Sequence, residues 1–100
     1  FGKGVYFADM VTKSANYCNT NRSSNIGILL LCEVALGECN EKLRADYYAG
    51  DLPEGKLSTK GLGKMAPPEK SYVELDGVTV PLGKGADTKV RDTVLLYNEY

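Results

Sequence analysis

The feature of this sequence that most constrains its fold is an apolar run from Ile26 to Leu36, whose only charge is Glu33. Both alternating faces of the run are apolar, which is typical of a central strand covered on each side. Gly37 ends the run. We therefore expect a strand over residues 26–36 near the middle of a sheet. Glu33 is expected to be a partly exposed or paired carboxylate rather than a catalytic one.

The start of the chain predicts a strand that leads into a helix. Val5–Ala8 is a short β-branched and aromatic run, which is the composition of a buried strand. Asp9 follows it, and its carboxylate is of a type that caps helices. From Met10 to Cys18 the apolar residues recur at helical spacing. The sequence thus predicts a strand, an Asp9 cap and a helix.

Two residues of this predicted helix, Ser14 and Tyr17, lie about one turn apart on the same face. Tyr6 stands where the strand leads into the helix, so a hydroxyl and two phenol rings could converge on one small pocket. An ordinary interpretation is also open. A tyrosine on a helix face is more often part of a core, and a serine within a helix usually faces solvent or bonds back to a carbonyl.

The rest of the chain predicts further strands joined by loops. Asp76-Gly77 between two alternating segments is the strongest short signal for a β-hairpin. Proline and glycine predict a loop over residues 51–68, whose lysines could serve binding although most such loops are only connections. The predicted strands are residues 39–43, 72–75, 78–82 and 94–100. One short helix among several strands implies an α+β fold with a largely antiparallel sheet.

Length and composition exclude several classes of protein. A chain of 100 residues forms one domain at most. Its net charge of −1 argues against a nucleic-acid-binding surface within these residues. The 3 cysteines cannot all pair, which favours reduced thiols in a cytosolic or nuclear protein. The absence of histidine removes the commonest general base and metal ligand, and no segment reaches the roughly 18 apolar residues that a membrane span needs.

Five motifs, in order along the whole chain, resemble the catalytic domain of poly(ADP-ribose) polymerases, and in particular their DNA-damage-activated nuclear branch. They are residues Phe1–Met10, Lys13–Cys18, Glu33–Gly37, Lys60–Lys64 and Leu96–Tyr100. The resemblance implies a split, largely antiparallel sheet of the ADP-ribosyltransferase type. It also implies that residues 1–100 are a fragment of this domain, truncated at both ends, because the chain starts at Phe1 and stops within an aromatic run. Such a fragment is expected to be inactive alone.

The resemblance implies a role for each matching residue. Glu99 corresponds to the catalytic glutamate, and Lys13 to a lysine beside it. Tyr6 corresponds to the tyrosine of the family's His-Tyr-Glu triad and lies against the nicotinamide ring of NAD, and Tyr17 stacks on the other face of that ring. Ser14 bonds the carboxamide. Phe7 and Ala8 belong to the same binding site. The triad histidine, and a glycine that grips the carboxamide, fall before Phe1.

The implied activity is NAD-dependent transfer of ADP-ribose to proteins and to a growing polymer, in DNA damage response and repair. NAD is the substrate and no metal is expected. The implied partners are acceptor proteins and poly(ADP-ribose), with DNA bound only through other domains and no membrane association, in the nucleus. The alternatives are a mono-ADP-ribosyltransferase, a non-catalytic module that retains the fold, and an interaction domain unrelated to NAD. Glu99 with both tyrosines argues against the non-catalytic module. An interaction domain unrelated to NAD would leave the placement of Tyr6, Ser14 and Tyr17 as an accident, and Glu99 favours polymer formation.

Overall fold

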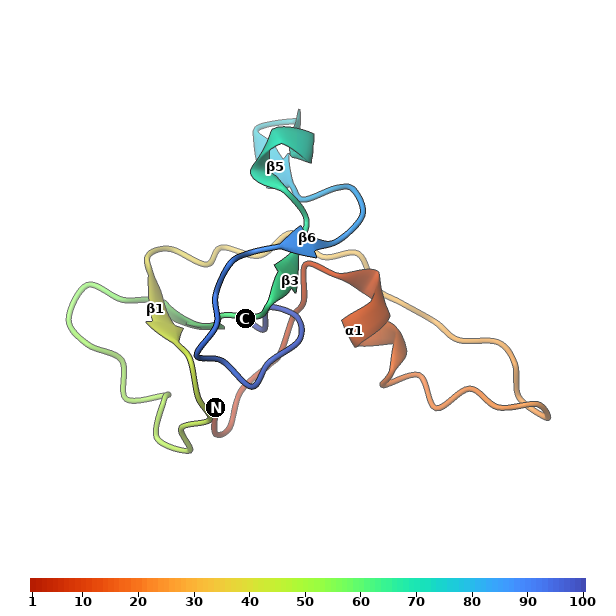
Figure 1. Ribbon diagram of the computed structural model, residues 1–100, viewed down its shortest axis with the longest axis horizontal. Coiled ribbons are helices and arrows are strands. Elements are labelled where there is room, and N and C mark those ends of the chain that lie inside the picture. Colours follow the sequence, from red (N-terminus) through yellow and green to blue (C-terminus); the bar gives the residue numbers. More distant parts are fainter.

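A computed structural model describes residues 1–100, with extents of 46 × 32 × 27 Å. It is a small mixed structure of one short helix, one 3₁₀ turn and six short strands. Figure 1 shows a central body from which an arm, formed by the chain between the helix and the first strand, extends to one side, and a hairpin projects at the top. The elements are α1 (Val11–Ala15), β1 (Cys39–Lys42), β2 (Ser58–Gly61), β3 (Met65–Ala66), η1 (Glu69–Ser71), β4 (Val73–Leu75), β5 (Val78–Val80) and β6 (Ala86–Asp87).

The strands form three two-stranded sheets, of which two are antiparallel. β3 pairs with β6 and β4 pairs with β5 in antiparallel register, whereas β1 and β2 are parallel. The predicted class of a mixed helix and strand domain with antiparallel sheets is therefore confirmed at this coarse level. The strand predicted over residues 39–43 is also confirmed, because β1 covers all but its last residue.

The hairpin predicted at Asp76-Gly77 is confirmed. β4 and β5 pair in the register Val73 with Val80 and Leu75 with Val78. Asp76 has φ 50° and Gly77 has φ 79°, so both central residues adopt the positive φ that a type I′ turn requires. The local sequence determines this element, because the turn joins strands that are adjacent in the chain.

The prediction that residues 51–68 form only a loop is wrong. β2 lies within them and pairs with β1 from Cys39–Ser58 to Lys42–Gly61. The amide of Leu62 extends the ladder by donating to the carbonyl of Lys42 at 2.9 Å. The strand is short and lies between turn residues, so composition hides it, and its partner is remote in sequence.

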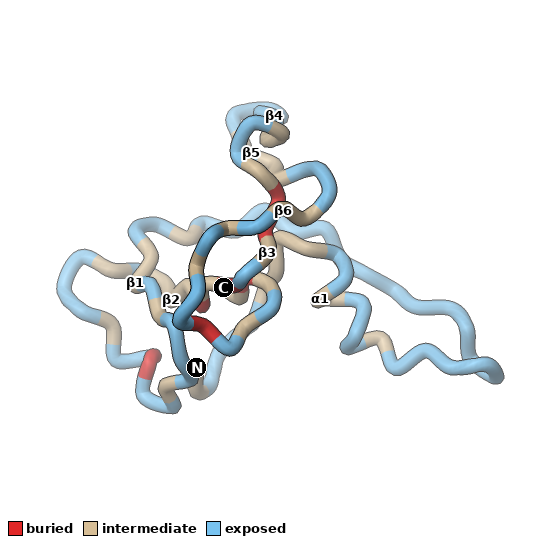
Figure 2. The backbone as a smooth tube through the Cα atoms, viewed as in Figure 1, coloured by how far each residue is buried: buried red, intermediate tan, exposed pale blue.

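The central strand predicted over residues 26–36 is also wrong. No backbone hydrogen bond joins this segment to another. Its apolar side chains are exposed, with Ile26 at 83% and Leu31 at 96%, and Figure 2 shows the arm in the colour of exposed residues. Apolar composition indicates a tendency to form a strand, but a strand exists only where a partner supplies the ladder.

The strands predicted over Val5–Ala8 and over residues 94–100 do not form continuous ladders, and Val5 is 80% exposed rather than buried, but the two segments meet. The backbones of Phe7 and Tyr100 exchange two hydrogen bonds, at 2.9 and 3.0 Å. Glu99 forms an isolated antiparallel bridge with Gly61, and Tyr97 a parallel bridge with Met65. Isolated backbone pairings therefore join the C-terminal segment to the start of the chain and to the segment that contains β2 and β3.

The buried residues of the central body are small or polar. They are Ala49, Gly61, Gly63, Ala66, Pro67, Thr93 and Asn98. Figure 2 shows most of them close to the C-terminus. A Cβ atom on Gly63 would lie 2.2 Å from the backbone carbon of Tyr97, so only glycine permits this close approach of the C-terminal segment.

The predicted helix is present but shorter than expected. α1 ends at Ala15, and the chain continues in tight turns in which Tyr17 donates to the carbonyl of Ser14 and Cys18 to that of Ala15, both at 3.1 Å. The predicted cap is wrong, since the residue at the N-cap position is Met10 and no side chain caps the helix. The carboxylate of Asp9 instead accepts hydrogen bonds from Asn98 and Tyr100.

Candidate functional site

A pocket of about 240 Å³ lies where the start of the chain, α1 and the C-terminal segment meet. Its lining consists of Tyr6, Phe7, Ala8, Lys13, Ser14, Tyr17 and Glu99. These are the seven residues that the sequence resemblance assigned to catalysis and to ligand binding. The structure therefore brings all of them together around one cavity, while their individual roles stay predictions.

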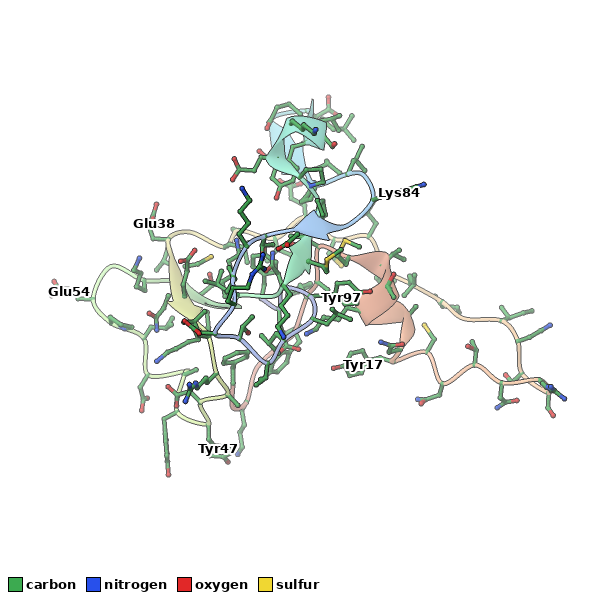
Figure 3. All side chains as sticks on the ribbon, in the orientation of Figure 1. Tyr17, Glu38, Tyr47, Glu54, Lys84 and Tyr97 are labelled. Carbon is green, nitrogen blue, oxygen red and sulfur yellow. The ribbon has the colours of Figure 1, made fainter.

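Two tyrosines supply accessible aromatic surface at this pocket. Tyr6 is 45% exposed and Tyr17 is 71% exposed. The hydroxyl of Tyr6 donates to the carbonyl of Gly2 at 2.5 Å, which restrains its ring. Figure 3 shows the Tyr17 side chain extending from the end of α1 toward the body of the protein, not along the arm. Such faces can hold a flat aromatic ligand by offset stacking.

An ion pair forms the charged part of the pocket. Nζ of Lys13 lies 3.1 Å from Oε1 of Glu99, and the two side chains are only 16% and 15% exposed. Lys13 comes from α1 and Glu99 from the last residues of the chain. Partial burial strengthens their attraction relative to a surface pair and restricts both side chains to few orientations.

The backbone of Glu99 is paired with Gly61, and that of the next residue, Tyr100, is paired with Phe7. Its amide donates to the carbonyl of Gly61 at 3.0 Å, and its carbonyl accepts from the amide of Gly61 at 2.7 Å. The pairing of Phe7 with Tyr100 fastens the next residue to the pocket wall. These four hydrogen bonds hold the backbone of Glu99 and Tyr100 to two separate segments, which limits where the Glu99 side chain can lie.

The carboxylate of Asp9, predicted as a helix cap, instead binds the residues that flank Glu99. Its Oδ2 accepts from Nδ2 of Asn98 at 2.7 Å and from the hydroxyl of Tyr100 at 3.0 Å. Burial and the Asp9 carboxylate raise the pKa of Tyr100 above its usual range, so this hydroxyl keeps its proton and remains a donor. Sequence reasoning missed this contact. Its only signal was the presence of polar residues on both sides of Glu99.

Two further contacts extend the polar network around the C-terminal segment. Oδ1 of Asn98 accepts from the amide of Gly63 at 2.8 Å. Nζ of Lys60, one of the lysines in the predicted loop, lies 5.3 Å from the centre of the Tyr100 ring, within the range of a cation–π contact. Lys60 thus contacts the residue next to Glu99 from the sheet that β1 and β2 form.

The structure holds no group of three or more Cys, Asp or Glu side chains with the spacing of a metal site. All three cysteines are free thiols. None of its helices has the length and apolar character that crossing a bilayer requires. The polar and aromatic groups that line the pocket are hydroxyls, aromatic rings, an ammonium and a carboxylate.

Comparison with known proteins finds the same family over the whole chain. The family model described as the poly(ADP-ribose) polymerase catalytic domain matches residues 1–100. All of this chain aligns with poly(ADP-ribose) polymerase 2 of Arabidopsis thaliana at 61% identity, with poly(ADP-ribose) polymerase 2 of Homo sapiens at 58%, and with poly(ADP-ribose) polymerase 1 of Danio rerio at 57%. The aligned parts are 16%, 18% and 10% of those relatives. The chain thus spans less than a fifth of their length.

Proposed function

This chain belongs to the poly(ADP-ribose) polymerase catalytic domain family, and from that membership we propose that it supplies the nicotinamide half of an NAD-dependent ADP-ribosyltransferase site. The full-length protein transfers ADP-ribose from NAD to protein acceptors and to a growing polymer, and releases nicotinamide. The names of the relatives support polymer formation. The proposed fold is the split sheet of the ADP-ribosyltransferases, of which residues 1–100 form a part.

One observation carries the proposal. The Glu99 carboxylate, paired with Lys13, lines the same pocket as two exposed tyrosine rings and the Ser14 residue. A fixed negative charge beside a site for a flat aromatic group matches the needs of a reaction in which a cation forms next to a departing aromatic ring. A non-catalytic module has no need of such a partly buried charge beside aromatic rings.

The binding roles follow from side-chain chemistry. Tyr6 and Tyr17 hold the nicotinamide ring between them, and each aromatic pair contributes about 0.5–1.5 kcal/mol beyond its area burial. The Ser14 hydroxyl donates to the carboxamide oxygen of nicotinamide. Phe7 and Ala8 form the wall beside the ring, and the paired backbone of Phe7 keeps that wall in place.

Glu99 acts in the chemical step. The bond between the ribose C1′ and the nicotinamide nitrogen breaks, and its electron pair leaves with nicotinamide, so positive charge develops on the ribose. The carboxylate stabilises that charge, as carboxylates do for the oxocarbenium-like transition states of glycosidases. An acceptor hydroxyl then forms the new bond to C1′, and the carboxylate polarises it and receives its proton. Lys13 keeps the carboxylate oriented through the 3.1 Å ion pair.

We extend the proposal to the protein as a whole. Its partners are NAD, acceptor proteins and poly(ADP-ribose), with DNA contacted through other domains, and it acts in the nucleus in the response to DNA damage. The second candidate is mono-ADP-ribosylation. The glutamate at position 99 favours the polymer, because elongation requires a carboxylate that orients a ribose hydroxyl.

The experiment measures nicotinamide release and product length by the full-length protein supplied with NAD carrying a label in its adenylate part. Release of nicotinamide with labelled chains of many units supports the proposal. Single ADP-ribose units would support mono-ADP-ribosylation, and the absence of any release would contradict enzymatic function. Free nicotinamide should inhibit competitively with NAD.

A further inference from the structure

A single carboxylate oxygen holds the side chains on both sides of Glu99. Oδ2 of Asp9 accepts hydrogen bonds from Asn98, 2.7 Å away, and from Tyr100, 3.0 Å away. These are the residues immediately before and after the glutamate. In an extended segment, the side chains at neighbouring positions point to the face opposite the central one. Asp9 therefore binds the C-terminal segment on the face opposite the Glu99 side chain.

The backbone of the Asn98–Tyr100 segment is also held by hydrogen bonds of its own. Glu99 pairs with Gly61 and Tyr100 pairs with Phe7, and the side chain of Asn98 binds the amide of Gly63. These contacts fix where the segment lies, whereas the Asp9 carboxylate restrains its rotation about the segment axis, because it binds both flanking side chains. That rotation decides where the Glu99 carboxylate points.

The contact of Asp9 with Asn98 and Tyr100 is largely shielded from solvent. Asn98 is only 5% exposed. The second oxygen of Asp9, Oδ1, is buried and has no hydrogen-bond partner. An unpartnered buried polar atom destabilises the folded state, so an apolar side chain would fill this position at lower cost. A carboxylate in such a place is consistent with a requirement for an acceptor that serves Asn98 and Tyr100 together.

We propose that Asp9 is a positioning residue for the reaction: it fixes the rotation of the Asn98–Tyr100 segment and thereby directs the Glu99 carboxylate toward the pocket and toward Lys13. The inference rests on the proposed function, in which Glu99 acts on the ribose. Asp9 itself does not line the pocket, so it contributes to turnover through Glu99 and not through contact with NAD.

The test compares four variants of the full-length protein: Asp9→Ala, Asp9→Asn, Glu99→Gln, and Asp9→Ala combined with Glu99→Gln. An exposed aspartate elsewhere, changed as Asp92→Ala, is the matched control. The readouts are kcat and KM for NAD, and the Kd of nicotinamide. Asp9→Ala should lower kcat about 10- to 100-fold, the range for a misplaced catalytic group, with KM and the nicotinamide Kd within about twofold. Asp9→Asn keeps an oxygen acceptor and should restore most of kcat.

The double variant separates positioning from a general structural role. In the Glu99→Gln background Asp9→Ala should lower kcat by less than about twofold more, because its effect passes through the group already removed. If Asp9→Ala lowered kcat in the Glu99→Gln background by the same factor as in the wild type, the proposal would be overturned. A wild-type kcat in Asp9→Ala alone would overturn it as well. If Asp9→Ala fails to bind nicotinamide, Tyr100→Phe replaces it. That change removes one hydroxyl, and a wild-type kcat there would likewise overturn the proposal.

The proposed function fails independently of this inference. If wild-type protein releases nicotinamide and Glu99→Gln does not, the function stands whatever Asp9 does. If Glu99→Gln retains wild-type turnover, the function proposed for Glu99 is wrong, and the positioning role fails with it.

Discussion

Lys13 and Glu99, from opposite ends of the chain, meet in one pocket, with Nζ 3.1 Å from Oε1. Each is about one-sixth exposed or less. The pair joins the helix that carries Ser14 and precedes Tyr17 to the segment that carries the glutamate. The binding part and the reacting part of the proposed site are therefore linked by a direct electrostatic contact.

Removing the charge of Glu99 while keeping its shape should stop catalysis without preventing binding. In the full-length protein Glu99→Gln should reduce turnover about 10²–10³-fold, the usual scale for one preorganised electrostatic group. Elongation should fall more than the first attachment, because a ribose hydroxyl needs to be oriented. Product length and nicotinamide Kd are measured together. A variant that still makes long polymer at a near-normal rate would remove Glu99 from the mechanism.

Truncating the helix side of the pocket should weaken nicotinamide. Ser14→Ala removes a hydroxyl donor and should raise the Kd by the equivalent of about 0.5–1.5 kcal/mol. Tyr17→Ala removes one stacking face and should weaken binding at least as much. Tyr48→Ala is the control, since that ring is 73% exposed and lies outside the pocket. Unchanged affinity in both Ser14→Ala and Tyr17→Ala would show that nicotinamide does not bind here.

Breaking the ion pair from the lysine side should affect turnover more than folding. Lys13→Met keeps the length of the side chain but removes the ion-pair partner of the Glu99 carboxylate, and kcat should fall about tenfold or more. Lys13→Arg should retain much of the rate. Lys42→Met is the matched control, because it breaks an ion pair with Asp46 of 2.9 Å outside the pocket. Equal kcat in Lys13→Met and Lys42→Met would contradict the orienting role.

A side chain at the second central position of the hairpin turn, Gly77, should destabilise the folded protein. Gly77 has φ 79°, so Gly77→Ala places an L-residue in the left-handed region at a cost of about 1–2 kcal/mol. Thermal unfolding of the full-length protein measures the loss as a lower Tm. Gly50→Ala is the control, since Gly50 has open space around it and no positive φ. A Tm lowered equally by both changes would argue against the type I′ turn.

The ion pair of Asp87 and Arg91 should stabilise the folded protein in a way that is lost at acid pH. The hydrogen bonds of the Arg91 guanidinium, and then that of the Lys89 amide, lower the pKa of Asp87 from 3.8 to about 2. Because the folded-state pKa is lowered, the resulting stabilisation is present above the unfolded pKa and is lost as pH falls from about 4 through about 2. Arg91→Gln should raise the pKa toward 3.8, as read from NMR titration. An unchanged pKa in that variant would show that the guanidinium is not the main cause.

Features that depend on neighbours in sequence could be predicted from the sequence. Asp76-Gly77 determines its own turn, since φ and the strand partner are both local. The start of the helix after residue 9 was also predictable, and the strand near Cys39 was predicted from its composition although its partner is remote in sequence. The seven pocket residues came from a resemblance of motifs, and the structure gathers them around one cavity without testing their roles.

Features that depend on remote partners could not be predicted. β2 exists because its backbone meets β1, and nothing in Ser58–Gly61 itself indicates that partner. The run over residues 26–36 has the composition of a central strand, yet in the described structure no segment pairs with it. Composition reports the preference of a residue for a pleated and covered surface, whereas the supply of that surface is a property of the whole fold.

Asp9 shows the same division at a single residue. Its sequence position between an apolar run and a helix indicates a cap, which is a local role open to any aspartate before a helix. Tertiary structure decided otherwise, because the chain brings Asn98 and Tyr100 to within 2.7 and 3.0 Å of its carboxylate. The sequence determined which chemical groups are present and which turns they form locally. The tertiary structure decided which of these groups face one another, since contacts between residues so far apart depend on the path of the entire backbone.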